Sequence, residues 1–224
     1  MRLPLIWALI GVVLSALRLA VAAEPLAPAQ QARVDRALLD YASGRLQPAG
    51  RAFERLALQG VPVAQYNLAV MHLRKELPQP NLTQARRWMQ RAAQGGFVTA
   101  QHNLGKALET GLWGPRDLVR AHDWYQRAAE AGSVDAQVAM GTAHYLGRGR
   151  PQDGAQAAHW FREAAKAGDV GAMYLLASMY EKGDGITADR RLARYWYAAA
   201  AALGDEAAPA KLKELDAAGA GASS

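Results

Sequence analysis

The feature that most constrains this chain is a repeat with a period of 36 residues. Four tryptophans follow one another at this spacing, and each is followed four positions later by a pair of alanines. A glycine slot and an alanine slot keep the same phase. A fixed period of about 20–50 residues is typical of a solenoid, in which each short unit buries its apolar face against its neighbours. The slots are Trp88, Trp124, Trp160 and Trp196; Gly60, Gly96, Gly132, Gly168 and Gly204; Ala64, Ala100, Ala136, Ala172 and Ala208.

Within a repeat, the pattern predicts a first helix, which is clearest over residues 136–146. Ala136, Met140 and His144 recur at steps of four residues, and this spacing places them on one face of a helix. A small residue in the middle of this face lets a neighbouring helix approach closely. The loop that follows contains glycine and proline, through which a helix does not readily continue.

A second helix is predicted over residues 155–167. Asp153 stands where a side chain is needed to cap the helix N-terminus, and the other repeats carry aspartate or asparagine there. Trp160, Phe161 and the alanine pair form one apolar stripe. Gly168 can adopt the left-handed conformation that ends a helix. Each repeat is therefore predicted to be a helical hairpin.

The repeats leave shorter segments at both ends of the chain. The segment before the first full repeat carries a shortened form of the pattern, and the small, polar C-terminus is expected to be disordered. The predicted division is a signal peptide at 1–23, an N-terminal cap or degenerate repeat at 24–63, repeats at 64–99, 100–135, 136–171 and 172–207, a C-terminal capping helix at 208–216 and a disordered tail at 217–224.

The N-terminus has the features of an export signal. Arg2 precedes an uncharged apolar run over residues 3–17, and the small residues of 20–23 follow it. A run of about 15 residues is short for crossing about 30 Å of hydrocarbon. We therefore expect a cleaved signal peptide, a periplasmic or secreted protein, and no stable membrane insertion after cleavage. An uncleaved N-terminal anchor is the alternative.

The repeat slots resemble those of a known family. The pattern A-x-x-x-L-G-x-x-Y, then G-x-G, D, A, W-Y, A-A and G is similar to the Sel-1-like repeat family, relatives of the tetratricopeptide repeats. The resemblance covers roughly residues 40–210. It departs at Lys75, Leu77 and Trp113, which replace loop glycines. The resemblance implies an all-α, right-handed α/α superhelix (a solenoid) of about four 36-residue helix-turn-helix repeats between capping helices, used as an adaptor or scaffold.

Composition and motifs exclude several kinds of chemistry. The chain has no cysteine, which excludes disulfides, iron–sulfur clusters, zinc ribbons and a thiol nucleophile. Phosphate-binding, nucleophile-elbow and metalloprotease motifs are absent from the sequence, and the G-x-G pairs do not follow a strand. The formal charge of +6 is spread along the chain and does not indicate a nucleic-acid partner. We expect a protein that is not an enzyme and needs no cofactor; a hydrolytic site in the groove is the fallback.

The five histidines do not share a metal-ligand spacing. His72 and His144 occupy one repeat slot and are expected to pack, so no metal site is predicted. His122 and His159 flank the repeat tryptophans on the second helices and are expected to be partly exposed.

Function is then expected on side chains that packing does not use. By analogy with tetratricopeptide repeats, the first helices line a concave face, and several of its slots vary between repeats while the packing slots do not. Tyrosine in such slots favours an interface. The alternative is that these side chains are only solvated, and for Tyr145 that it fills an aromatic packing slot. The candidate binding residues are Tyr66, Val70, Arg74, His102, Lys106, Glu109, Thr142, Tyr145, Tyr174, Ser178 and Lys182.

Two functions stay open at this point. The first is an exported adaptor that binds a protein or peptide partner on the concave face, in envelope assembly or signalling. The second is a glycan-binding accessory that contacts peptidoglycan or an exopolysaccharide. Outward-facing arginines such as Arg86 and Arg190 are expected either to be solvated or to contact anionic polysaccharide or lipid headgroups.

Overall fold

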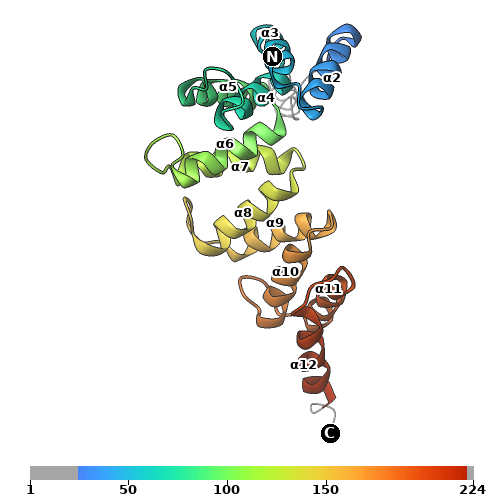
Figure 1. Cartoon of the computed structure of the whole chain (residues 1–224). Coiled ribbons are helices and arrows are strands. Elements are labelled where there is room, and N and C mark those ends of the chain that lie inside the picture. The colour runs from blue at the N-terminus through green and yellow to red at the C-terminus, as the bar shows by residue number, and fades with distance from the viewer. Residues whose placement is uncertain (1–24, 221–224) are drawn as a thin grey trace, which may run out of the picture. The chain divides into compact units, whose positions relative to one another are not determined.

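The computed structural model describes residues 25–220, and every regular element in this range is a helix. The all-α prediction is therefore confirmed (Figure 1). The predicted signal peptide and residues 221–224 lie outside the described residues. The helices are α2 Pro28–Ala42, α3 Leu46–Leu58, α4 Pro62–Leu73, α5 Leu82–Gln94, α6 Val98–Thr110, α7 Leu118–Glu130, α8 Val134–Leu146, α9 Gly154–Lys166, α10 Val170–Lys182, α11 Arg190–Ala202 and α12 Ala208–Ala220.

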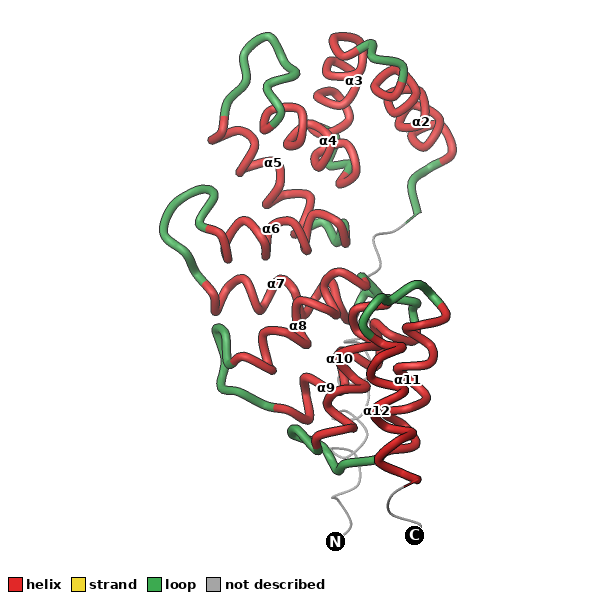
Figure 2. The backbone as a smooth tube through the Cα atoms, turned by 60° about the horizontal axis from the view of Figure 1, so that its bottom comes forward, coloured by secondary structure: helices red, strands yellow, loops and turns green. Residues whose placement is uncertain are grey.

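The chain divides into two compact units, with the boundary between Phe97 and Val98. Unit 1 contains α2 to α5, and unit 2 contains α6 to α12. In each unit, consecutive helices pair as hairpins, and each hairpin packs on the next (Figure 2). Helix α12 covers the segment predicted as a C-terminal capping helix and packs on α11. It runs to Ala220, so residues 217–220 are helical and not disordered as predicted.

The helix ends follow the local signals in the sequence. The Asp153 carboxylate accepts a hydrogen bond from the amide of Gln156 at 2.9 Å, and Asp117 and Asp189 cap α7 and α11 in the same way. Each such bond satisfies one of the amides that the first turn of a helix leaves without a partner. Gly168 has a φ of +97°, so the left-handed turn predicted after α9 is confirmed.

In the loop of the first full repeat, Lys75 takes the left-handed conformation that glycine has in the other repeats. Lys75 has a φ of 59°, close to the 71° of Gly183 in the equivalent position. A side chain with a Cβ is disfavoured in this region of backbone space. Lys75 is therefore held in a backbone conformation that costs a residue with a side chain more than it costs glycine.

The small residues of the first helices allow the close approach that was predicted. A Cβ added to Gly141 would lie 2.6 Å from the ring of Phe161, and one added to Gly105 would lie 2.8 Å from the ring of Tyr125. These rings follow the repeat tryptophans in sequence and are almost completely buried. In these two repeats, the aromatic residue after the tryptophan therefore packs directly on the backbone of the partner helix.

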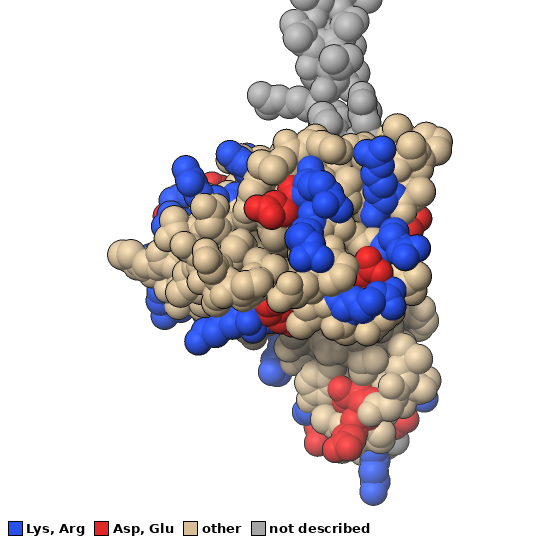
Figure 3. Space-filling view, turned by 45° about the horizontal axis from the view of Figure 1, so that its top comes forward, with Lys and Arg blue, Asp and Glu red and all other residues tan. Residues whose placement is uncertain are grey.

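The surface of the protein is rich in basic side chains, as the formal charge of +6 indicates. Lys and Arg outnumber Asp and Glu on the upper part of the face seen in Figure 3. Among residues 25–220, the helices are all too short or too polar to span a bilayer.

Candidate functional site

In unit 1, three predicted binding residues lie on α4 or at its end. Tyr66 and Val70 are partly exposed, and the ring of Tyr66 lies 5.1 Å from that of Phe97. Arg74 is exposed, and its guanidinium donates to the hydroxyl of Tyr41 at 3.0 Å. This contact ties the end of α4 to α2. Arg74 therefore links two hairpins through a hydrogen bond, although its side chain is exposed.

In unit 2, α6 carries the next three predicted residues. The ring of His102 lies 5.6 Å from that of Tyr125, whose hydroxyl donates to the Glu109 carboxylate at 2.8 Å. Lys106 is exposed between them on the same helix. His102 and Glu109 thus cover a buried aromatic ring on α7, while Lys106 points to solvent.

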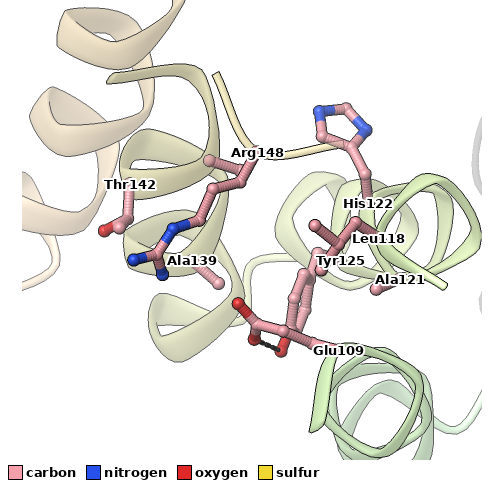
Figure 4. Close-up of a pocket in the computed structure, with 9 residues that line it drawn as sticks. Glu109, Leu118, Ala121, His122, Tyr125, Ala139, Thr142 and Arg148 are labelled. Carbon is pink, nitrogen blue, oxygen red and sulfur yellow. Dashed lines mark hydrogen bonds between the residues drawn. The ribbon is translucent and has the colours of Figure 1, made fainter. Parts of the chain in front are cut away.

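A small cavity of about 150 Å³ lies beside this hydrogen bond. Glu109 and Tyr125 line one side of it, and Thr142 and Arg148 face them from α8 and the loop after it (Figure 4). The cavity therefore joins two of the predicted residues, one from α6 and one from α8. Arg148 was missed in the sequence, because a loop position carries no helical periodicity.

The remaining predicted residues lie on α8 and α10. The ring of Tyr174 lies 5.2 Å from that of Tyr197, and the Tyr145 hydroxyl donates to Asp184 at 2.7 Å. Ser178 is partly exposed, and Lys182 is exposed at the end of α10. Tyr145 therefore bridges α8 to the loop after α10, as the packing interpretation of this residue requires.

A buried tyrosine and a glutamate occur together in alternate repeats. Tyr197 donates to Glu181 at 2.7 Å, and this pair stands 72 residues after the pair of Tyr125 and Glu109. In the repeat between them, Phe161 takes the ring position, and the carboxylate is absent. A buried hydroxyl needs a hydrogen-bond partner, whereas a phenylalanine ring does not. The two glutamates thus have a structural role. A glutamate accompanies the tyrosine in both repeats and is missing where phenylalanine replaces it, and this correlation could have been read from the sequence.

Burial and these hydrogen bonds also determine the protonation of the two tyrosines. Burial, followed by the hydrogen bond to Glu109, raises the pKa of Tyr125 far above its ordinary value. The same causes, with Glu181 as partner, raise the pKa of Tyr197. Both phenols therefore stay protonated and act as donors.

The expectation that His122 is partly exposed is wrong. Its exposed fraction is 4%, and its Nε2 lies 3.4 Å from Nε2 of His144, the packing residue of the next repeat. The ring points away from the pair of Glu109 and Tyr125 (Figure 4). The Nδ1 atoms of both histidines are buried without a hydrogen bond, and burial lowers the pKa of both rings. His159 is exposed.

The charged groups of the described helices do not gather into a metal site. Among residues 25–220, no three histidine, aspartate or glutamate side chains lie where they could hold one ion. The carboxylates near the cavity instead bind phenols or guanidinium groups, as Glu109 binds Tyr125 and Asp123 binds Arg150.

Helical hairpins that repeat with one set of packing slots define a class of protein, the α-helical repeat solenoid. A model of the Sel1 repeat matches residues 62–97, 98–133, 134–169 and 170–205. The chain belongs to the Sel1 repeat family. Members of this family are generally non-catalytic repeat scaffolds, and their fold mediates protein–protein interactions.

Two solved structures illustrate the likeness. One is c5321, a protective antigen of uropathogenic Escherichia coli, which is 30% identical with a TM-score of 0.76 and matches 83% of this chain. The chain spans 41% of the length of that protein. The other is a Sel1 repeat protein from Oxalobacter formigenes, which is 28% identical with a TM-score of 0.76; the match covers 81% of this chain and 74% of that protein. A search of curated protein sequences gives no match.

Proposed function

We propose that the chain is a non-enzymatic, exported adaptor that binds a protein or peptide partner through the face lined by α6, α8 and α10 of unit 2. The observation that carries this proposal is a row of equivalent positions on three successive hairpins. Lys106, Thr142 and Ser178 stand 36 residues apart, each directly after the small residue that packs on the second helix. The small residue before each of them is required for packing. The three side chains themselves differ in chemistry and are exposed or partly exposed.

The arrangement of the row suits an extended peptide. The row crosses three successive hairpins, which pack on one another through α7 and α8 and through α9 and α10. An extended chain can follow such a row because its side chains and carbonyl groups recur along its length. The row offers the Lys106 ammonium group and the Thr142 hydroxyl, which can donate hydrogen bonds to peptide carbonyls. The Ser178 hydroxyl interacts with Tyr197. Tyr174 and His102 add ring surface beside it.

The structural residues and the binding residues of this face can now be separated. Glu109 and Tyr145 hold neighbouring elements through hydrogen bonds, so their substitution is expected to affect folding as well as binding. Lys106, Thr142 and Lys182 have no such partner among the described residues, which makes them the sharper probes of binding.

The test is site-specific photo-crosslinking in native envelope extract. A crosslinker at Thr142 is expected to capture one dominant protein, and this adduct should disappear when Lys106→Glu is added. The matched control carries the crosslinker at His159, an exposed position on α9, and should not give that adduct. The same adducts at both positions would refute the assignment of the face. Capture of cell-wall fragments alone, with co-sedimentation on purified sacculi, would favour the glycan-binding function instead.

Export rests on the N-terminal sequence. The proposal requires that the mature protein starts after Ala22 or Ala23, where small residues permit cleavage. Mass spectrometry of the protein recovered from a periplasmic fraction measures this directly, and an intact Met1 in a membrane fraction would favour the anchor.

A further inference from the structure

Unit 1 carries a groove that the proposed function does not use. It lies between α2 and α3, it has a volume of about 590 Å³, and its lining residues come from these two helices and the residue after α3. Four of the lining residues are arginines, Arg33 and Arg36 on α2 and Arg51 and Arg55 on α3. Asp40 is the acidic residue among them.

The negative charge of Asp40 is already neutralised. Its Oδ1 accepts a hydrogen bond from Arg45 at 2.7 Å and lies 3.6 Å from Nε of Arg36. This carboxylate therefore cannot also neutralise the other arginines of the groove.

Three arginines of the groove remain without a carboxylate. Arg33, Arg51 and Arg55 are exposed and make no ion pair with any residue in 25–220. Guanidinium groups stay charged at all ordinary pH values. The groove consequently presents three guanidinium groups that make no ion pair with a described carboxylate.

The arginines stand on both walls of the groove. Arg51 and Arg55 are four residues apart and share one face of α3, and Arg33 and Arg36 are three residues apart on α2. The two helices form a hairpin with a short turn, so residues near the start of α2 lie opposite the end of α3 (Figure 2). Arg33 and Arg55 therefore face the groove at the end away from the turn.

Apart from Gln59, the rest of the lining is small or apolar. Ala32, Ala52, Pro48 and Leu56 contribute few polar atoms, and they leave room between the charged side chains. A ligand in the groove would therefore contact both guanidinium groups and apolar carbon. The flat surface of a bilayer does not enter such a recess, and a polysaccharide offers few apolar groups to it. A peptide carries both kinds of group.

We propose that this groove binds an acidic segment of a partner protein. Aspartate or glutamate carboxylates of the segment accept paired hydrogen bonds from the arginine side chains, a geometry that the planar guanidinium favours. The methylene and methyl groups of the same segment pack on the alanines and Leu56. All basic residues in 25–60 are arginines, as this mode of recognition requires.

The test measures binding of a labelled peptide of alternating glutamate and alanine to the purified full chain, by fluorescence anisotropy at low ionic strength. The charge-reversal variant Arg51→Glu/Arg55→Glu should raise the Kd by at least about tenfold. Added salt should weaken binding to the unchanged protein, because exposed charges are screened. A peptide with glutamine in place of glutamate should not bind.

The matched control is Arg190→Glu/Arg191→Glu, which makes the same change in net charge at exposed positions of α11 in unit 2. It should change the Kd by less than about twofold if the groove itself binds the peptide. An equal loss in both variants, equal binding of the glutamine peptide, or no binding to the unchanged protein would each overturn the proposal. Binding of phosphatidylglycerol vesicles that only Arg51→Glu/Arg55→Glu abolishes, without peptide binding, would assign the groove to lipid headgroups and overturn it too. Far-UV circular dichroism checks folding, and Arg51→Gln/Arg55→Gln replaces the first variant if that one unfolds.

Discussion

Replacing Gly141 by alanine should destabilise this protein, although alanine is the better helix former. The added Cβ would lie 2.6 Å from Cδ1 and Cε1 of Phe161, and real side chains essentially never approach so closely. Phe161 has an exposed fraction of 2%, so its ring has no solvent to move into. Overpacking of this kind costs about 1–3 kcal/mol. The gain in helix propensity from glycine to alanine is about 1 kcal/mol.

Because the buried ring cannot move aside, we take the upper part of this range, about 2–3 kcal/mol. Subtracting the gain in propensity leaves an expected net loss of about 1–2 kcal/mol in the free energy of unfolding. Urea denaturation followed by circular dichroism measures this loss as a lower midpoint. Gly171→Ala is the matched control on α10. A Cβ there would meet only Asp169 Oδ1 at 3.4 Å, so the protein should gain about 0.5–1 kcal/mol.

Glycine-to-alanine substitution is thus expected to lower the free energy of unfolding at position 141 and to raise it at position 171. A Gly141→Ala variant as stable as the unchanged protein would mean that the contact between α8 and α9 is looser than the structure has it. A second variant, Gly141→Ala/Phe161→Leu, removes the ring that the methyl group would strike, and should be closer to the unchanged protein than the two single losses added together. Simple additivity would also contradict the reasoning.

Three further outcomes are expected. Glu109→Leu should cost about 1–3 kcal/mol because it leaves the buried hydroxyl of Tyr125 without a partner, and adding Tyr125→Phe should recover most of the loss in a double-mutant cycle. Burial lowers the pKa of His122 and His144 in the folded state, so as the pH falls these histidines take up protons more readily in the unfolded chain. The free energy of unfolding should therefore be highest above about pH 6.5 and should decrease as the pH drops below this value. A urea midpoint that is constant from pH 7.5 to pH 5.5 would contradict this, and His144→Tyr, the residue another repeat carries, should flatten the dependence. Lys75→Gly should raise the melting temperature, since it removes about 1–2 kcal/mol of backbone strain at φ 59°, and an unchanged or lower value would count against that strain.

Much of the fold could be predicted because its signals are local and repeated. The period of 36 residues, the capping aspartates such as Asp153 and the terminal glycines such as Gly168 each act within one hairpin, and four copies of each signal agree. The helical phase of Phe161 within α9 also follows from its distance to Trp160 and the alanine pair. These features depend on the 3.6-residue period of a helix, which can be read from the sequence.

The site was predicted less completely, because its residues meet across hairpins. Periodicity placed Glu109 and Tyr145 on the first helices, but it could not reveal that their polar atoms bind Tyr125 and Asp184. Arg148 lines the cavity from a loop, and helical periodicity does not predict the position of a loop side chain.

The sequence by itself determined that this chain is a helical repeat protein of the Sel1 type, with each helix beginning and ending where its own residues require. Only the tertiary structure decided which side chains are buried between hairpins, as His122 against His144 illustrates. It also decided which charges find partners and which, like those of Arg51 and Arg55, remain open on a groove. The physical reason is that helix formation depends on neighbours in sequence, whereas burial and charge pairing depend on neighbours in space, which a single helical period does not specify.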